Sequence, residues 1–205
     1  MKKLSRLLIV AIVLLISCKE SKISESSQAR EVMILDTLLS FADEASLAQA
    51  FGKNNVTRDT LWYPEASGQY VVSVLYANSP RKVSVIWNDS INFSGLSEVF
   101  IDEPGTRWQT SEGITVGTPL SSLVTLNKGP LEFMGLEWDY GGLVDWSNGA
   151  LQHRRLQVTL GLPEIYDTTA NLDSLIGDQR ISSEWAIAKK INPVAIKVSL
   201  LKEHE

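Results

Sequence analysis

The chain is poor in the residues that build most reactive centres. Among its 205 residues are one cysteine, Cys18, and two histidines, His153 and His204. A single thiol cannot form an intramolecular disulfide or a zinc cluster, and a metal site needs several converging ligands. The sequence therefore predicts no metal site and no cofactor.

Two common catalytic and nucleotide-binding motifs are also missing. No Gly-x-Ser-x-Gly elbow is present. The pair Gly113 and Gly117 is followed by Thr118-Pro119, without the lysine that phosphate-binding loops use. We therefore predict that the protein is not an enzyme and that it has no catalytic residue.

Positive charge is scarce as well. The chain has 19 Lys and Arg against 24 Asp and Glu, for a net charge of −5. Residues 1–17 carry Lys2, Lys3 and Arg6 and no acid, so their removal takes the net charge to −8. Because phosphate binding requires a basic face, this balance excludes a nucleic-acid partner.

What is present begins with a leader. Met1 to Arg6 is a positive segment, and Leu7 to Ile16 is an uninterrupted apolar run. A bilayer span needs about 20 apolar residues, so this run is too short to cross a membrane. It fits the hydrophobic region of a signal peptide instead.

Leu15-Ile16-Ser17-Cys18 follows directly and resembles the lipobox of bacterial lipoproteins. The resemblance implies a signal peptide over residues 1–17, with fatty acyl chains such as palmitate on Cys18. Several acyl chains make membrane anchoring stable. No aspartate follows the cysteine, so we expect the outer membrane, on either its periplasmic or its surface side.

Residues 18–40 are predicted to form a lipidated tether, because Ser21 to Arg30 is rich in Ser, Lys and Glu. Residues 41–205 are predicted to form a single globular α+β domain. We expect an antiparallel sheet with helices packed on one face, and two tandem helix-plus-three-strand units over residues 41–90 and 113–162.

The second unit carries the clearest signals. Thr118-Pro119 is a good helix opening, and Leu120 to Asn127 has apolar residues at helical spacing. Leu131 to Trp138 and Leu143 to Trp146 are predicted as the strands of a hairpin, and Leu156 to Leu160 alternates as a half-buried strand does.

The first unit follows the same order. Asp43 or Ser46 can cap a helix that ends at Gly52, and alternation then predicts strands ending with Val83 to Trp87. We therefore expect a repeated supersecondary unit.

The start of the second unit also resembles a known group of proteins. Gly113, Ile114, Gly117, Thr118 and Leu123 match the segment that precedes each repeat helix in beta-lactamase-inhibitor-like proteins and in the small outer-membrane lipoproteins of the barrel-assembly machinery. The first unit lacks this start. The resemblance implies a protein-binding scaffold without chemistry.

The hairpin of the second unit concentrates aromatic and acidic residues. Trp138, Asp139, Tyr140 and Trp146 are the candidate partner-binding residues. If exposed, the aromatics would form a binding hot spot or a stacking platform for sugar rings; if buried, they would fill the core. The carboxylates of Glu137 and Asp139 are the residues that glycan cleavage would use.

The leading hypothesis is a lipid-anchored, non-catalytic module of the bacterial cell envelope that binds another envelope protein. A glycan-binding or glycan-cleaving lipoprotein is the first alternative. A structural envelope lipoprotein without a discrete ligand is the second.

Overall fold

A computed structural model describes residues 31–63, 68–138 and 140–202. The compact unit begins at Glu31, so the expected boundary between tether and domain at residue 40 is too late. Leu35 and Leu38 are both fully buried, on a 3-10 helix η1 (Leu35–Ser40). Their burial explains the shift, because the segment before Phe41 contributes side chains to the core.

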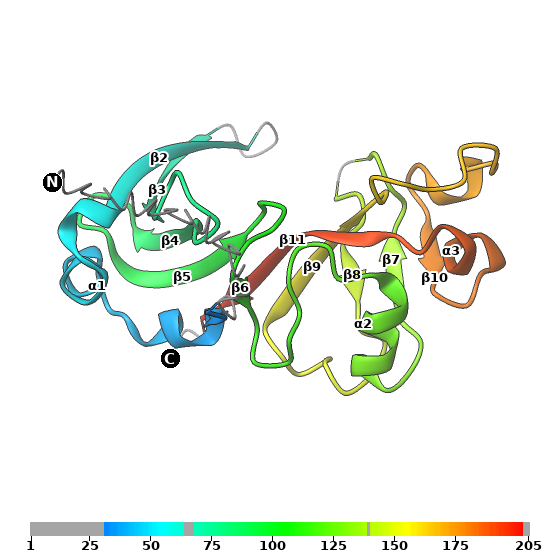
Figure 1. The fold of residues 1–205 in the computed structure, drawn as a ribbon, viewed down its shortest axis with the longest axis horizontal. Coiled ribbons are helices and arrows are strands. Elements are labelled where there is room, and N and C mark those ends of the chain that lie inside the picture. The colour runs from blue at the N-terminus through cyan, green and yellow to red at the C-terminus, as the bar shows by residue number, and fades with distance from the viewer. Residues whose placement is uncertain (1–30, 64–67, 139, 203–205) are drawn as a thin grey trace, which may run out of the picture. The chain divides into compact units, whose positions relative to one another are not determined.

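The largest sheet has six strands, and every neighbouring pair of its strands is antiparallel (Figure 1). Its order is β2 (Val56–Tyr63), β3 (Gly68–Leu75), β4 (Val83–Asp89), β5 (Ser94–Ile101), β11 (Val194–Leu201) and β9 (Leu156–Gly161). The last strand of the chain, β11, thus lies between β5 and β9, which are distant in sequence.

Two smaller sheets accompany it. Strands β10 (Arg180–Ser182), β7 (Glu132–Met134) and β8 (Val144–Asp145) form an antiparallel sheet, whereas β1 (Met33–Ile34) pairs in parallel with β6 (Trp108–Gln109). The helices are α1 (Glu44–Phe51), α2 (Leu120–Asn127) and α3 (Ala186–Ile191), with short 3-10 helices η2 (Lys53–Asn55) and η3 (Asp173–Leu175). The predicted α+β class with mostly antiparallel sheets is confirmed.

Helix α1 begins and ends as its sequence predicts. The Asp43 side chain accepts a hydrogen bond from the Ser46 backbone N–H at 2.7 Å, and the Ser46 hydroxyl accepts one from the Asp43 N–H. This reciprocal pair satisfies two N–H groups that a helix start leaves without partners. Gly52 then ends the helix with a φ of 91°, a conformation that favours glycine.

Helix α2 begins one residue later than predicted. Pro119 takes the N-cap position, and the Thr118 hydroxyl instead accepts a hydrogen bond from the Thr115 N–H at 2.9 Å. Lys128, and not Gly129, adopts the left-handed conformation that ends the helix. The helix ends at Asn127, the last residue of the segment with helical spacing.

The two-unit expectation is not confirmed. In the predicted second unit, β7 and β8 belong to the three-stranded sheet, whereas β9 belongs to the six-stranded sheet. In the first unit, β2, β3 and β4 are consecutive neighbours in one sheet. The two segments share the order of their elements but not one arrangement of strands.

A single hydrophobic cluster fills the interior, and the predicted alternation decides which side chains enter it. Val83, Val85 and Trp87 of β4 are buried members of this cluster, and so are the apolar residues of β9, which are Leu156, Val158 and Leu160. Across residues 31–63, 68–138 and 140–202, no helix combines the length and apolar character needed to cross a membrane.

Candidate binding loop

The connection between β7 and β8 presents two large aromatic side chains to solvent. Trp138 is 57% exposed and Tyr140 is 72% exposed. We call residues 135–138 and 140–143 the aromatic loop. Asp139, the third candidate in this stretch, and Cys18, the expected lipidation site, lie outside the described residues.

The base of the aromatic loop is tied to backbone on two sides. The Gly135 N–H donates to the Gln179 carbonyl at 2.8 Å, and the Leu136 N–H donates to the Leu175 carbonyl at 2.7 Å. On the other side, the Leu160 N–H of β9 donates to the Gly142 carbonyl at 2.8 Å. These bonds fix both ends of the loop, so its aromatic residues project from an anchored backbone.

Two glycines make this close approach possible. A Cβ atom on Gly142 would lie 1.9 Å from the Leu160 carbonyl oxygen, and a Cβ atom on Gly135 would lie 2.1 Å from the Gly177 carbonyl oxygen. Gly142 also has a φ of 77°. The absence of a side chain at these glycines therefore allows close backbone contact as well as chain reversal.

The loop also holds two non-glycine residues in the left-handed region. Glu137 and Tyr140 both have a φ of 59°, a conformation that is uncommon for residues with a side chain. Strained backbone of this kind concentrates at binding and catalytic sites. Here it accompanies the two most exposed aromatic side chains of the hairpin.

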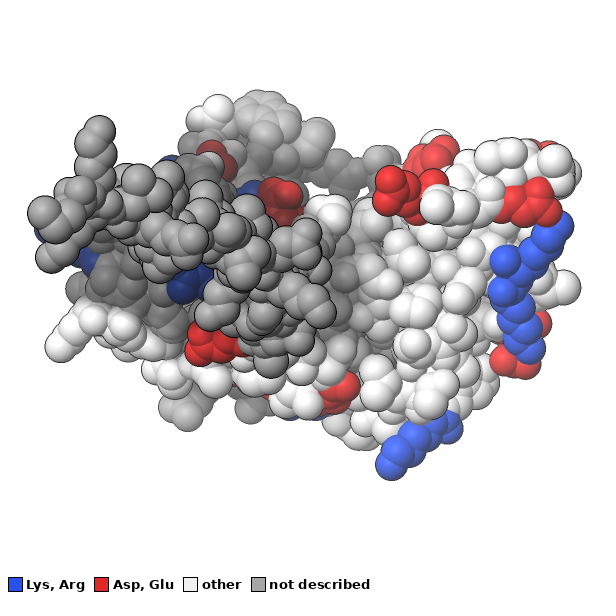
Figure 2. Space-filling model, in the orientation of Figure 1, with Lys and Arg blue, Asp and Glu red and all other residues white. Residues whose placement is uncertain are grey.

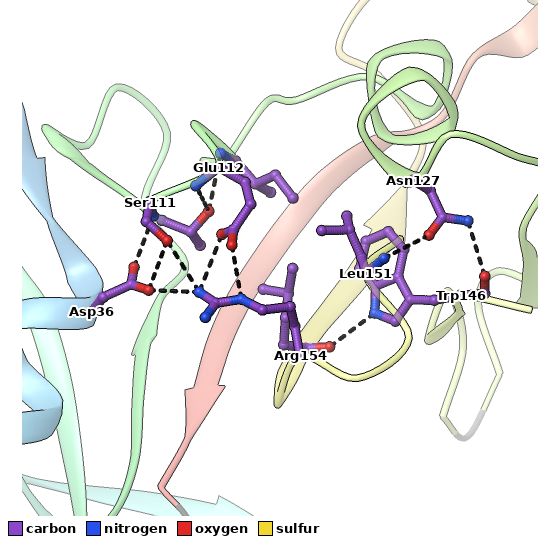
Figure 3. Close-up of polar contacts among 10 residues, drawn as sticks. Asp36, Ser111, Glu112, Asn127, Trp146, Leu151 and Arg154 are labelled. Atoms are coloured by element: carbon purple, nitrogen blue, oxygen red, sulfur yellow. Dashed lines mark hydrogen bonds and ion pairs between the residues drawn. The ribbon is translucent and has the colours of Figure 1, made fainter. Parts of the chain in front are cut away.

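Trp146, in contrast, is a core residue, and its assignment to a binding surface is wrong. It is 6% exposed, and its indole N–H donates to the Leu156 carbonyl of β9 at 3.0 Å (Figure 3). The side chain lies in the hydrophobic cluster together with Val144 and Leu156. It is therefore not available to a partner.

Hydrogen bonds of a buried asparagine, Asn127, stabilise the backbone that follows Trp146. The Asn127 amide nitrogen donates to the Trp146 carbonyl at 2.9 Å, and its amide oxygen accepts from the Leu151 N–H at 3.2 Å (Figure 3). Asn127 is fully buried at the end of α2. Sequence alone predicts only that Asn127 lies at the end of the helix, because nothing local distinguishes a buried asparagine there from an exposed one.

A second polar cluster, also missed from sequence, joins three distant segments. The Arg154 guanidinium contacts an Asp36 carboxylate oxygen at 2.6 Å and a Glu112 carboxylate oxygen at 2.7 Å (Figure 3). Asp36 also accepts hydrogen bonds from the backbone N–H and the hydroxyl of Ser111. The cluster connects η1 to the segment after β6 and to the turn before β9.

Burial raises the pKa of Asp36, but the hydrogen bonds from Arg154 and Ser111 outweigh that effect and hold it below its usual value. The charges of this cluster are thus satisfied within the chain. Its arrangement indicates a structural connection between segments rather than a site with reactive groups.

The acids beside the aromatic loop are also paired. An Arg180 guanidinium nitrogen lies 2.9 Å from an Asp145 carboxylate oxygen and 3.3 Å from a Glu132 carboxylate oxygen. A hydrogen bond from the Ser147 backbone N–H is the main cause that lowers the pKa of Asp145, and the hydrogen bond from Arg180 lowers it further. These two carboxylates share one arginine, so they are engaged in an ion pair on the surface of the small sheet.

Metal-ligating side chains do not gather in the described part of the chain. Within it, no group of three or more His, Cys, Asp or Glu residues could hold a metal ion. His153 is exposed in the turn before β9. Of the acid pair predicted from sequence, Glu137 belongs to the described loop and Asp139 lies outside the described residues.

The site thus offers exposed aromatic surface on a loop whose ends are hydrogen-bonded to neighbouring backbone. Comparison with protein families, with characterised proteins and with solved structures found no match for this chain.

Proposed function

We propose that the protein is a lipid-anchored, non-catalytic binding module of the bacterial cell envelope, and that the aromatic loop contacts a partner protein. The observation that carries the proposal is the exposure of Trp138 and Tyr140, at 57% and 72%, on a loop whose ends are both hydrogen-bonded to neighbouring backbone. Trp and Tyr are enriched among the residues that dominate binding energy.

Anchoring of the loop backbone supports the proposal through conformational entropy. Ordering a mobile loop on binding costs free energy, and a loop that is already held loses less. The left-handed conformations of Glu137 and Tyr140 show that the surroundings hold the backbone in a shape it would not adopt alone.

The aromatic loop lies on the side of the face that carries acidic side chains. In Figure 1 the connection between β7 and β8 runs along the upper edge of the view, and in Figure 2 small acidic groups stand at that edge, whereas the wide uncharged area lies below it, around α2. A partner that contacts the aromatic side chains would therefore also meet carboxylates.

Membrane attachment comes from the leader and Cys18, and it places the module at the outer membrane. Met33, the start of β1, lies 15 positions after Cys18. An extended chain of this length reaches at most about 50 Å. The aromatic loop would therefore act close to the membrane surface, on partners that are embedded in it or lie beside it.

The test is photo-crosslinking in the bacterium that makes the protein. A photoreactive phenylalanine analogue replaces Trp138 in the full chain, and a matched chain carries it at Ile165, which is 90% exposed in another loop. The proposal predicts a discrete crosslinked protein from position 138 that is absent from position 165. Equal products from both positions, or none from 138, would overturn it.

Affinity for the crosslinked partner then separates binding from folding. Replacement of Trp138 or Tyr140 by alanine is expected to weaken binding by about 2 kcal/mol, or about 30-fold, as at other hot spots. Ile165→Ala is the control and should bind as the wild type does. Retention on envelope polysaccharide without a protein partner would favour the glycan-binding alternative.

A further inference from the structure

The segment that carries the aromatic loop is acidic and has no basic residue of its own. Between Lys128 and Arg154 the sequence contains four Asp and Glu residues and no Lys or Arg. Three of these acids, Glu132, Glu137 and Asp145, belong to the described residues. The charge of this segment is therefore neutralised from elsewhere in the chain or left facing solvent.

Only part of that charge is neutralised by the residues that the structure describes. Arg180 of β10 pairs with both Asp145 and Glu132, so one positive charge serves two negative ones. Glu137 is exposed, and it forms no ion pair with a Lys, Arg or His of the described chain. Three described carboxylates against one guanidinium leave the small sheet and the aromatic loop with a net charge of −2.

An exposed aromatic residue directly follows the unpaired carboxylate in the chain. Trp138 comes after Glu137 and is 57% exposed. The Gly141 N–H donates to the Trp138 carbonyl at 2.6 Å, which closes a tight turn and fixes the backbone at this tryptophan. Among the described residues, no Lys or Arg lies over the Trp138 ring. The loop thus presents a ring and a carboxylate that no described cation occupies.

Elsewhere in the molecule a cation is held between a ring and a carboxylate. The Arg58 guanidinium lies 3.6 Å from the centroid of the Phe93 ring, and it contacts a Glu44 carboxylate oxygen at 2.6 Å. The negative face of the ring and the carboxylate both attract the positive charge. One guanidinium can make both contacts, because it stacks on a ring through its plane and donates hydrogen bonds from its edge.

Lys197 repeats this arrangement on β11. Its ammonium nitrogen lies 4.2 Å from the centroid of the Phe100 ring and 3.1 Å from a Glu98 carboxylate oxygen. In both places the chain itself supplies the ring, the cation and the carboxylate. The aromatic loop has the ring of Trp138 and the carboxylate of Glu137 without a described cation, so a ligand can supply the third member.

Charge decides which kind of ligand the loop favours. A local net charge of −2, in a chain whose net charge is −5, attracts a cationic group and repels an anionic one. An uncharged sugar ring can stack on Trp138, but it leaves the charge of Glu137 without a counterpart. A second copy of this chain carries the same negative net charge and therefore gains no long-range attraction.

We propose that the aromatic loop recognises a basic side chain of its partner protein, with arginine preferred to lysine. The guanidinium would lie over the Trp138 ring and pair with the Glu137 carboxylate, and the exposed Tyr140 would add contact area. Arginine is preferred because its plane stacks while its edge pairs. This inference rests on the proposed function, since it names the chemistry of the group that the aromatic loop contacts.

The test uses the full chain in detergent micelles and, as the probe, a phage-displayed library of random peptides about 10 residues long. Peptides that bind the wild type but not Trp138→Ala are those that use the aromatic loop. We expect these peptides to share an arginine or a lysine. Each is then synthesised with that arginine and with citrulline, which keeps the shape of arginine without its charge; norleucine replaces lysine in the same way.

Citrulline is expected to weaken binding to the wild type about fivefold, because a cation–π contact and a partly exposed ion pair are lost. Glu137→Gln should weaken binding of the arginine peptide and leave the citrulline peptide unchanged. Glu31→Gln is the matched control, because it removes the same charge from an exposed residue at the start of the folded unit. It should bind both peptides as the wild type does.

The outcomes separate this inference from the proposed function. If no peptide depends on Trp138, the aromatic loop is not a protein-binding surface and both proposals are overturned. If Trp138-dependent peptides bind equally well with citrulline, or if Glu137→Gln changes nothing, the loop binds protein but does not recognise a basic side chain. Trp138-dependent retention on envelope polysaccharide that Glu137→Gln leaves unchanged would also overturn the inference, in favour of a glycan ligand.

Discussion

Trp138 and Trp146 lie eight positions apart in one hairpin and have opposite environments. Trp138 is 57% exposed, whereas Trp146 is 6% exposed and donates its indole N–H to the Leu156 carbonyl. Both follow short strand segments, and β7 and β8 are three and two residues long. Segments this short carry too little alternation to predict which tryptophan faces the core.

At the same scale, Trp146→Phe should destabilise the fold while Trp138→Phe should not. Phenylalanine keeps the ring but leaves the Leu156 carbonyl without its donor inside the core. A buried acceptor left without a partner costs about 1–3 kcal/mol, whereas exposed substitutions usually change stability by less than about 0.5 kcal/mol. Chemical denaturation measures both, and equal losses for the two variants would contradict the assignment.

Gly142→Ala tests the anchoring of the aromatic loop. The added Cβ would lie 1.9 Å from the Leu160 carbonyl oxygen, at a residue whose φ is 77°. We expect a loss of at least about 2 kcal/mol in the free energy of unfolding, from overpacking and backbone strain. Gly105→Ala is the control, since its Cβ would meet nothing within 4 Å and its φ is also positive; a similar loss in both would assign the effect to φ alone.

Among the elements, η1 is held to the rest of the molecule by the cluster of Asp36, Ser111, Glu112 and Arg154. The two members of this cluster that are most distant in sequence, Asp36 and Arg154, lie 118 positions apart. The cluster explains why a segment that sequence placed in the tether belongs to the folded unit. The sequence around Asp36 contains no local pattern that predicts a contact with Arg154.

Asp36→Asn should change how stability depends on pH. The pKa of Asp36 is lowered in the folded state, so its ionised form stabilises the fold. That contribution is complete above the unfolded pKa of about 4 and is lost as pH falls through the folded value. The difference in unfolding free energy between wild type and Asp36→Asn should therefore be largest near neutral pH and shrink below about pH 4.

Urea unfolding of both proteins across this pH range provides the measurement. A constant difference between wild type and variant at all pH values would mean that the Asp36 charge does not contribute.

Elements defined by local pattern were predictable, and those defined by distant pairing were not. Asp43, Gly52 and the alternation of Val83 to Trp87 placed α1 and β4 correctly. The insertion of β11 between β5 and β9 depends on contacts between residues far apart in the chain. For the same reason the apparent repeat did not predict that β7 and β8 leave the large sheet.

For the candidate site, sequence identified the hairpin and its aromatic residues, but it did not show which of them are exposed or what supports the loop. Trp138 and Tyr140 were named from composition and turn signals, and both are exposed. The backbone bonds of Gly135 and Gly142 arise from segments that the fold brings together. Local sequence marked Gly142 as a turn residue and placed Gly135 within a predicted strand, but it could not show what either glycine approaches.

At the scale of the whole molecule, we propose a lipid anchor at Cys18, a folded unit that begins at Glu31 and one exposed aromatic loop on that unit.

The most direct test of the proposal is mass spectrometry of the mature protein extracted from membranes of its native cell. The account predicts a chain that begins at Cys18 and carries the added mass of fatty acyl chains on its sulfur and its amine. A mature chain that begins at another residue, or one with Cys18 as an unmodified thiol, would contradict it.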